Sequence, residues 1–122
     1  YENSNYVSLH LPKMKETLGL VNADLMSKMP KGGAIINTAR KEVVCEESLK
    51  KIMDQRADFL YTADVAPDCR AELEEKYGVR VFFTAKKMGA QTGEANVNAG
   101  IAAIKQIIGY LENGDTTFQV NK

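Results

Sequence analysis

The chain has little of what metal, disulfide and nucleic-acid-binding proteins require. It contains 122 residues with one histidine and two cysteines, and its 16 basic side chains are balanced by 16 acidic ones. Because Cys45 and Cys69 lie at no metal-binding spacing and only His10 could join them, a zinc site would lack ligands, and no disulfide framework is expected. The zero net charge gives no electrostatic reason to expect binding to nucleic acid or to a membrane surface.

Long hydrophobic runs are also missing. No apolar run approaches the roughly 20 residues needed to cross a bilayer, so we expect no membrane partner. The remaining composition, with 44% hydrophobic and 26% charged residues, is typical of one small globular domain. Because the two cysteines suggest no disulfide framework, we expect a reducing, cytoplasmic setting.

The order of the periodic segments predicts an α/β fold with a parallel sheet. Short apolar runs typical of strands alternate with stretches of helical periodicity, which is the pattern of βαβ units. Leu49, Ile52 and Met53, for example, fall on one face of an expected helix. The expected strands cover residues 7–11, 34–39, 59–65 and 79–84, and the expected helices cover 23–28, 46–56, 70–77 and 92–113, with a polar loop or short turn over 13–20.

Polar side chains stand where three of the expected strands end. Arg40 follows the second strand and Asp64 lies at the end of the third. Lys86 and Lys87 follow the fourth. In open α/β sheets the ligand lies outside the carboxyl ends of the parallel strands. These ends would therefore bring a cation, a carboxylate and an amine to one crevice, which is the layout of a catalytic site.

The same segments resemble a known family. The motifs are Asn37-Thr38-Ala39-Arg40 before Val43-Val44, then Asp64-Val65, and then Thr84 followed by Gly89-Ala90-Gln91-Thr92. In this order and spacing they resemble the D-isomer-specific 2-hydroxyacid dehydrogenases, in particular a short form of the branch that acts on D-3-phosphoglycerate, with lysine where most members carry histidine. The resemblance extends over residues 6–122. It implies the second half of a Rossmann-like NAD-binding domain followed by a long C-terminal helix, NAD as the cofactor, a small 2-hydroxy or 2-oxo acid as the substrate, and a homodimer of the full-length enzyme.

Arg40 is the candidate for holding the substrate. A hydride-transfer site for 2-oxo acids needs a fixed cation that holds the substrate carboxylate and polarises the carbonyl group. A guanidinium suits this task because it binds a carboxylate through two parallel hydrogen bonds and stays charged. The alternative, taken from the residue alone, is a strand-end arginine in a surface ion pair of little energetic weight. The resemblance favours the catalytic role.

The lysine pair is the candidate for the proton transfer that accompanies hydride transfer. Most family members have Thr-Pro-His in this segment, whereas this chain has Thr84-Ala85-Lys86-Lys87, and counting back from Gly89 places Lys87 in the position of the histidine. A lysine with an ordinary pKa of about 10.4 is a poor base at neutral pH. Burial in a closed cleft and the positive charge of Arg40 would both lower that pKa. Lys86 stays open as the active group, and a solvated Lys-Lys turn is the non-catalytic alternative.

The remaining candidates are cofactor contacts that the resemblance implies. Asp64 would accept a hydrogen bond from the nicotinamide amide, although an Asp at such a junction is more commonly a cap. Gly89 would allow close approach of the backbone to the nicotinamide amide. Thr38 and Ala39 would line the cofactor cleft beside the arginine, and Leu11 would belong to the segment on the adenosine side.

The chain is expected to be part of a longer enzyme. Gly32-Gly33 precedes a strand instead of linking a strand to a helix, so it cannot serve as the Gly-x-Gly-x-x-Gly turn of a dinucleotide site. We therefore expect residues 1–122 to be the C-terminal part of an NAD-binding domain, with residues 92–122 returning toward the substrate domain. The resemblance implies oxidation of D-3-phosphoglycerate to 3-phosphohydroxypyruvate in serine biosynthesis. The alternatives are another 2-hydroxy acid, or an inactive fragment that serves only for association.

Overall fold

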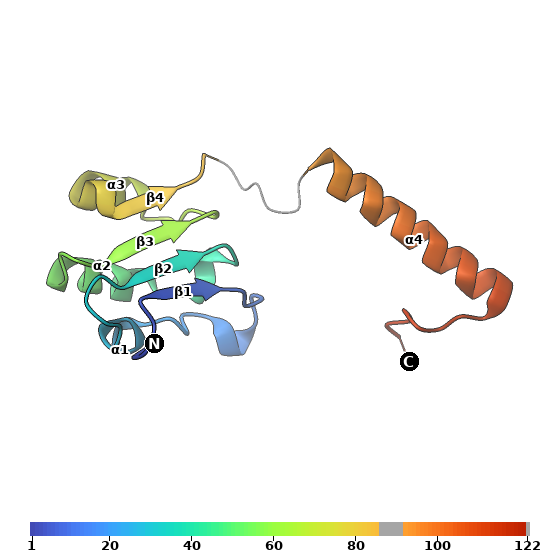
Figure 1. The fold of residues 1–122 in the computed structure, drawn as a ribbon, viewed down its shortest axis with the longest axis horizontal. Coiled ribbons are helices and arrows are strands. Elements are labelled where there is room, and N and C mark those ends of the chain that lie inside the picture. Colours follow the sequence, from blue (N-terminus) through green and yellow to red (C-terminus); the bar gives the residue numbers. More distant parts are fainter. Residues whose placement is uncertain (86–91, 122) are drawn as a thin grey trace. The chain divides into compact units, whose positions relative to one another are not determined.

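The four apolar runs form one parallel sheet. In the computed structural model, which describes residues 1–85 and 92–121, the strands are β1 (Tyr6–Leu9), β2 (Ala34–Asn37), β3 (Leu60–Ala63) and β4 (Val81–Phe83). They lie in the order β1-β2-β3-β4 and each neighbouring pair is parallel, so all four arrows point the same way in Figure 1. The predicted α/β architecture with a parallel sheet is confirmed.

Three helices connect the strands, and they are α1 (Ala23–Ser27), α2 (Glu46–Gln55) and α3 (Arg70–Tyr77). α1 begins where the sequence predicts, because the side-chain oxygen of Asn22 accepts a hydrogen bond from the backbone N–H of Leu25 at 3.1 Å. α2 buries the predicted apolar stripe of Leu49, Ile52 and Met53. The sequence therefore predicted both the start of α1 and the buried face of α2.

The hydrophobic core lies on one face of the sheet. Alternate residues of the strands pack with apolar side chains of the helices. They form two rows across the sheet, in which every side chain except that of Val7 is buried: Ile35, Tyr61, Val81, Leu9, Asn37, Ala63 and Phe83. Tyr6 and Phe82 occupy positions outside these rows, and their side chains are 72% and 62% exposed. Because successive side chains of a strand point to opposite faces, these exposed side chains belong to the second face of the sheet, which α1, α2 and α3 do not cover.

The strands are shorter than the sequence predicts. β2 ends at Asn37 instead of residue 39, because the Asn37 side chain hydrogen-bonds the backbone of Ala39 and Arg40 and turns the chain out of the sheet. The expected strand over 79–84 begins late, because Gly78–Arg80 forms a 3-10 turn and only Val81–Phe83 pair with β3. Two further 3-10 turns cover Lys15–Thr17 and Lys41–Val43, the first of them inside the segment predicted as a loop or short turn.

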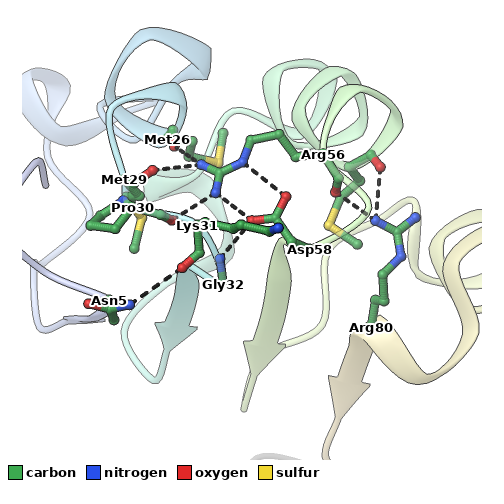
Figure 2. A network of polar contacts seen from close by, with 10 residues as sticks. Asn5, Met26, Met29, Pro30, Lys31, Gly32, Arg56, Asp58 and Arg80 are labelled. Atoms are coloured by element: carbon green, nitrogen blue, oxygen red, sulfur yellow. Dashed lines mark hydrogen bonds and ion pairs between the residues drawn. The ribbon is translucent and has the colours of Figure 1, made fainter.

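Two arginines hold the amino edge of the sheet, opposite the carboxyl ends of the strands (Figure 2). The Arg56 guanidinium lies 2.6 Å from the Asp58 carboxylate. It also donates hydrogen bonds to backbone carbonyl oxygens at and just after the end of α1, those of Met26, Met29 and Pro30. Arg80 donates to the carbonyl oxygens of Met53 and Arg56 at the end of α2. The final carbonyl groups of a helix have no partner within the helix, so these arginines satisfy them.

The chain divides into two compact units, Tyr1–Lys87 and Met88–Lys122. In the second unit α4 spans Gly93–Asn113, with Thr92 as its N-cap and Gly114 ending it at a left-handed φ of 65°. The apolar side chains that the sequence places at helical spacing are exposed: Val97, Ile101, Ile104, Ile107, Ile108 and Leu111. None of the helices in the described part of the chain is long and apolar enough to cross a membrane.

Candidate functional site

A cleft opens at the carboxyl ends of β1, β2 and β3, which is the edge where the sequence predicts a site. It has a volume of about 860 Å³. Its lining comes from the loops that follow the three strands: His10, Leu11, Pro12, Lys13, Thr38, Ala39, Arg40, Lys41, Glu42 and Val65. Within this lining the cations Lys13, Arg40 and Lys41 outnumber the single carboxylate, Glu42. The charge of the lining therefore favours an anionic ligand.

A buried asparagine shapes the loop that carries Arg40. Asn37 is only 1% exposed. Its Oδ1 accepts a hydrogen bond from the backbone N–H of Ala39 at 3.1 Å, and its Nδ2 donates to the backbone oxygen of Arg40, also at 3.1 Å. Nδ2 donates a second hydrogen bond to the Tyr61 hydroxyl at 3.4 Å. Because the oxygen and the nitrogen of the amide are both engaged, the side chain supports one conformation of residues 38–40.

Arg40 extends from this loop with an exposed side chain. Its backbone oxygen accepts a second hydrogen bond from the N–H of Val43 at 3.2 Å, so the main chain is held from both sides. Across residues 1–85 and 92–121, no hydrogen bond or ion pair engages the Arg40 guanidinium, and the surface ion pair considered as the alternative is not found there. A guanidinium in this state can bind a carboxylate in bidentate fashion.

Two ion pairs join the loops around the cleft. Lys13 Nζ lies 2.7 Å from Glu42 Oε1 and links the loop after β1 to the loop after β2. Lys41 pairs with Asp68 and links the loop after β2 to the loop after β3. The hydrogen bond from Lys13 lowers the pKa of Glu42, and the hydrogen bond to Asp68 raises the pKa of Lys41. Both shifts favour the charged forms, although exposed pairs of this kind add little stability.

Asp64 lies directly after β3 and is connected to the ends of both neighbouring strands. Its backbone N–H donates to the Asn37 carbonyl oxygen at 3.0 Å. The hydroxyl of Thr84, just after β4, lies 3.0 Å from both Asp64 Oδ1 and the Asp64 backbone oxygen. The next residue, Val65, lines the cleft. The carboxylate is thus held at the edge of the sheet where the cleft opens.

The structure brings together four of the residues predicted for the site. Leu11, Thr38, Ala39 and Arg40 all line the cleft, while Asp64 stands beside it as the neighbour of Val65. Lys87 and Gly89 lie outside the described residues, as does Lys86, which was the alternative base. The described geometry therefore brings Arg40 together with three of the residues predicted to contact the cofactor, and the roles of all the predicted site residues stay predictions.

Sequence reasoning missed the part played by Asn37 and the side chains of the two ion pairs. A signal for Asn37 was present, because a polar side chain inside a buried apolar run has to be hydrogen-bonded. The contact between Lys13 and Glu42 joins residues 29 positions apart. Because it depends on how two loops meet in space, no periodicity along the chain predicts it.

Comparison with known proteins decides the family. Residues 1–82 match the family described as D-isomer specific 2-hydroxyacid dehydrogenase, NAD binding domain. The chain belongs to this family. A 3-phosphoglycerate dehydrogenase of Entamoeba histolytica, solved with NAD+ bound, is 47% identical and superimposes with a TM-score of 0.86, covering 99% of this chain and 40% of that one. The D-3-phosphoglycerate dehydrogenase of Dictyostelium discoideum is 29% identical over 126 residues, covering 98% of this chain and 31% of the relative.

This 2-hydroxyacid dehydrogenase chain thus spans about a third of the Dictyostelium relative and two fifths of the Entamoeba one. A D-lactate dehydrogenase of Escherichia coli, 24% identical with a TM-score of 0.69, shares the fold. The predicted family, the Rossmann-like fold with its C-terminal helix, and NAD as the cofactor are confirmed.

The residues of the cleft fit one part of a nicotinamide dinucleotide. Pockets for small molecules have volumes of roughly 300–1,000 Å³ and combine apolar lining with a few fixed polar groups. The apolar side chains of Leu11, Pro12 and Val65 and the polar groups of Thr38 and Arg40 supply that combination. The position outside the carboxyl ends of parallel strands is the one that dinucleotide-binding sheets use. In the described part of the chain, no three His, Cys, Asp or Glu side chains are grouped so that they could hold a metal ion.

Proposed function

We propose that the full-length protein catalyses the NAD-dependent oxidation of D-3-phosphoglycerate to 3-phosphohydroxypyruvate, the reaction of serine biosynthesis. The main support for the proposal is the position of Arg40, which lines a cleft at the carboxyl ends of the strands. Its backbone oxygen accepts hydrogen bonds from Asn37 Nδ2 and from the N–H of Val43, which hold the loop in place. The names of the Entamoeba and Dictyostelium relatives, both phosphoglycerate dehydrogenases, support this choice of substrate.

Arg40 would hold the substrate. Its guanidinium would bind the carboxylate of the 2-hydroxy acid and place a positive charge beside the oxygen at C2, where negative charge develops as the hydroxyl proton leaves. The neighbouring cations Lys13 and Lys41 are already paired with Glu42 and Asp68. Arg40 is therefore the cation of the cleft lining with the most capacity to bind a further anion.

Four side chains and one backbone position would hold the cofactor. Bound in this way, NAD+ would supply the acceptor for the hydride of C2. Asp64, fixed by the Thr84 hydroxyl, would accept a hydrogen bond from the carboxamide of the nicotinamide and so orient the ring. Thr38 and Ala39 would line the nicotinamide side of the cleft and Leu11 the adenosine side, while Gly89 would give the backbone access to the carboxamide.

Lys87 would move the proton. A group near C2 must take the hydroxyl proton in oxidation and return it in the reverse reaction. The family position and the charge of Arg40, which would lower the pKa of a neighbouring lysine, support Lys87 in this role. Lys86, one residue earlier, is the competing candidate.

The reaction is tested in the reductive direction with the full-length protein. NADH oxidation is followed at 340 nm with 3-phosphohydroxypyruvate, hydroxypyruvate, glyoxylate and pyruvate, and we expect the highest kcat/KM for the phosphorylated substrate. A preference for one of the other three would reassign the substrate within the family. Absence of turnover with all four would favour the alternative that this chain serves only for association.

The base is tested with a matched pair of substitutions. Lys87→Met removes the amine while retaining much of the side-chain length, and Lys86→Met is the control one position away. We expect kcat to fall at least a hundredfold in Lys87→Met alone, which is within the usual contribution of acid–base catalysis. Loss in Lys86→Met alone would transfer the role to that residue, and full activity in both variants would reject a lysine base.

Assembly and location complete the proposal. We propose that residues 92–122 return toward a substrate domain and that the full-length enzyme is a cytoplasmic homodimer. The exposed apolar side chains along α4, such as Ile104 and Leu111, support a role for this helix in packing against another part of the enzyme or a second subunit. Sedimentation velocity of the full-length protein distinguishes a dimer from a monomer.

A further inference from the structure

We propose that Asn37 is a positioning residue that sets where Arg40 stands in the cleft, and that it does so through the hydrogen bond to the Arg40 backbone oxygen. This inference rests on the proposed function, because it assigns to Asn37 a share in how that site binds a 2-oxo acid. Asn37 itself faces the core and lines no part of the cleft.

The side-chain amide of Asn37 can form its hydrogen bonds to the loop in only one orientation. Its Oδ1 meets the N–H of Ala39 at 3.1 Å, and its Nδ2 meets the carbonyl oxygen of Arg40 at 3.1 Å. Turning the amide over would place an N–H2 group against an N–H donor and a carbonyl oxygen against another carbonyl oxygen. The side chain therefore binds both ends of the two-residue segment Ala39–Arg40 and fixes the turn that leads from β2 to Arg40.

Asn37 is itself fixed in the sheet, so it cannot shift to follow a different conformation of the loop. It is 1% exposed, and its Nδ2 also donates to the hydroxyl of Tyr61, a residue that is itself buried on the neighbouring strand β3. The main chain of Asn37 lies between Leu9 of β1 and Ala63 of β3, and the backbone N–H of Asp64 donates to its carbonyl oxygen at 3.0 Å. Asn37 thus connects the exposed loop to the sheet through its side chain.

The exposed loop depends on hydrogen bonds to hold Arg40 in position. Thr38 and the Arg40 side chain are exposed, so packing against the core does not determine their positions. The backbone oxygen of Arg40 has two donors, Asn37 Nδ2 and the N–H of Val43. The Val43 bond lies within the following 3-10 turn, and the Asn37 bond is the side-chain link from that oxygen to the sheet. Losing it would let the guanidinium shift relative to the cofactor.

The test separates this role from a general role in folding. Asn37→Asp keeps the size and the oxygen that accepts from Ala39 but replaces the donor to Arg40 by a carboxylate oxygen. In the full-length protein saturated with NADH, the dissociation constant for oxalate reports on Arg40 without turnover, because oxalate presents the carboxylate and adjacent oxygen of a 2-oxo acid. We expect the oxalate dissociation constant and the KM for the 2-oxo acid to rise roughly tenfold to a hundredfold, the usual effect of misplacing a site group by about 1 Å. The dissociation constant for NADH should stay within about twofold.

Two further variants serve as controls. Tyr61→Phe removes the longer hydrogen bond of Asn37 Nδ2, at 3.4 Å, but leaves Asn37 buried and both of its 3.1 Å bonds to the loop in place, so oxalate binding should stay within about twofold of wild type. Asn37→Leu has a similar size and no charge, so weakened oxalate binding in this variant shows that the effect of Asn37→Asp does not come from the added negative charge alone.

Three results would overturn the inference. They are unchanged oxalate binding in Asn37→Asp, unchanged binding in Asn37→Leu, and an equal weakening of NADH and oxalate binding in Asn37→Asp, which would indicate a disturbance of the whole cleft. The proposed function fails in a different way. If the wild type reduces no 2-oxo acid but still binds oxalate, and Asn37→Asp weakens that binding, the positioning role stands and the reaction is rejected.

Discussion

Thr84 Oγ1 lies 3.0 Å from Asp64 Oδ1, so a side-chain hydrogen bond joins the ends of β3 and β4. The same hydroxyl lies 3.0 Å from the Asp64 backbone oxygen. This contact lies at the edge of the sheet where the cleft opens, and it orients the carboxylate proposed to bind the nicotinamide carboxamide. The position of that carboxylate therefore depends on a residue 20 positions further along the chain.

Thr84→Val should weaken cofactor binding. Valine has the shape of threonine and lacks the hydroxyl, so Asp64 loses one fixed donor. We expect the dissociation constant for NADH, measured by fluorescence titration of the full-length protein, to rise roughly threefold to tenfold, in line with the loss of about 1 kcal/mol for one hydrogen bond. Thr84→Ser, which keeps the hydroxyl, is the control and should bind NADH nearly as well as wild type. Equal binding by Thr84→Val would reject the role given to this contact.

Arg56 should matter for stability and not for the cleft. It satisfies carbonyl groups at the end of α1 and pairs with Asp58, at the edge of the sheet opposite the cleft (Figure 2). We expect Arg56→Met to lower the free energy of unfolding by about 2–4 kcal/mol, because several carbonyl groups and the carboxylate lose a charged donor together. Urea denaturation measures this change. The NADH dissociation constant of the folded variant should match wild type, and a weakened one would show that the two edges are coupled.

The ion pair of Arg56 with Asp58 also predicts how the stability of the fold changes with pH. The hydrogen bond from Arg56 lowers the pKa of Asp58 below its ordinary value. A carboxyl whose pKa is lower in the folded state contributes stability that is fully present above the unfolded-state pKa of about 3.9. That contribution is lost as the pH falls below this value through the folded-state pKa. Asp58→Asn should therefore lower Tm at pH 7 and flatten the decline of Tm below pH 4. A variant whose Tm falls as steeply as that of wild type would contradict the assignment.

The two cysteines should differ in reactivity toward alkylating reagents. A hydrogen bond from the Ser48 side chain lowers the pKa of the Cys45 thiol, at the N-terminus of α2. Burial raises the pKa of Cys69 to about 12, with the nearby Glu46 carboxylate adding to the effect. Since the thiolate is the reactive form, iodoacetamide at pH 8 should modify Cys45 at least tenfold faster than Cys69, as followed by peptide mass spectrometry. Ser48→Ala should slow the reaction at Cys45, and equal rates at both thiols in the wild type would contradict the prediction.

The sequence predicted the fold well because local patterns determine most of it. The apolar runs around Ile35 and Tyr61 and the stripe on α2 specify strands and a helix that tertiary packing then confirms. Strand ends were less predictable. β2 stops two residues early because the Asn37 side chain binds the backbone that follows it, and β4 starts late because Gly78, at a φ of 55°, turns the chain into a 3-10 segment.

The sequence could indicate parts of the candidate site that depend on a single side chain, but not those that depend on a contact between distant residues. Arg40 and Asp64 could be chosen as candidates because each follows a strand and each has a charge that the proposed reaction would use. The ion pair of Lys13 with Glu42, and the contact of Thr84 with Asp64, could not be found, because each forms between loops or strand ends that are distant in the sequence. Such contacts depend on the register of the sheet, which the sequence pattern alone does not define.

The role proposed for Arg40 is that of the substrate-binding cation in a 2-hydroxyacid dehydrogenase site. It is tested most directly by steady-state reduction of 3-phosphohydroxypyruvate by full-length Arg40→Gln compared with wild type, together with equilibrium binding of NADH. We expect a loss in kcat/KM of at least a thousandfold, because the ion pair with the substrate and the stabilisation of charge at C2 disappear together, while the NADH dissociation constant changes by no more than about threefold. A variant that retains a tenth or more of the wild-type kcat/KM would contradict it.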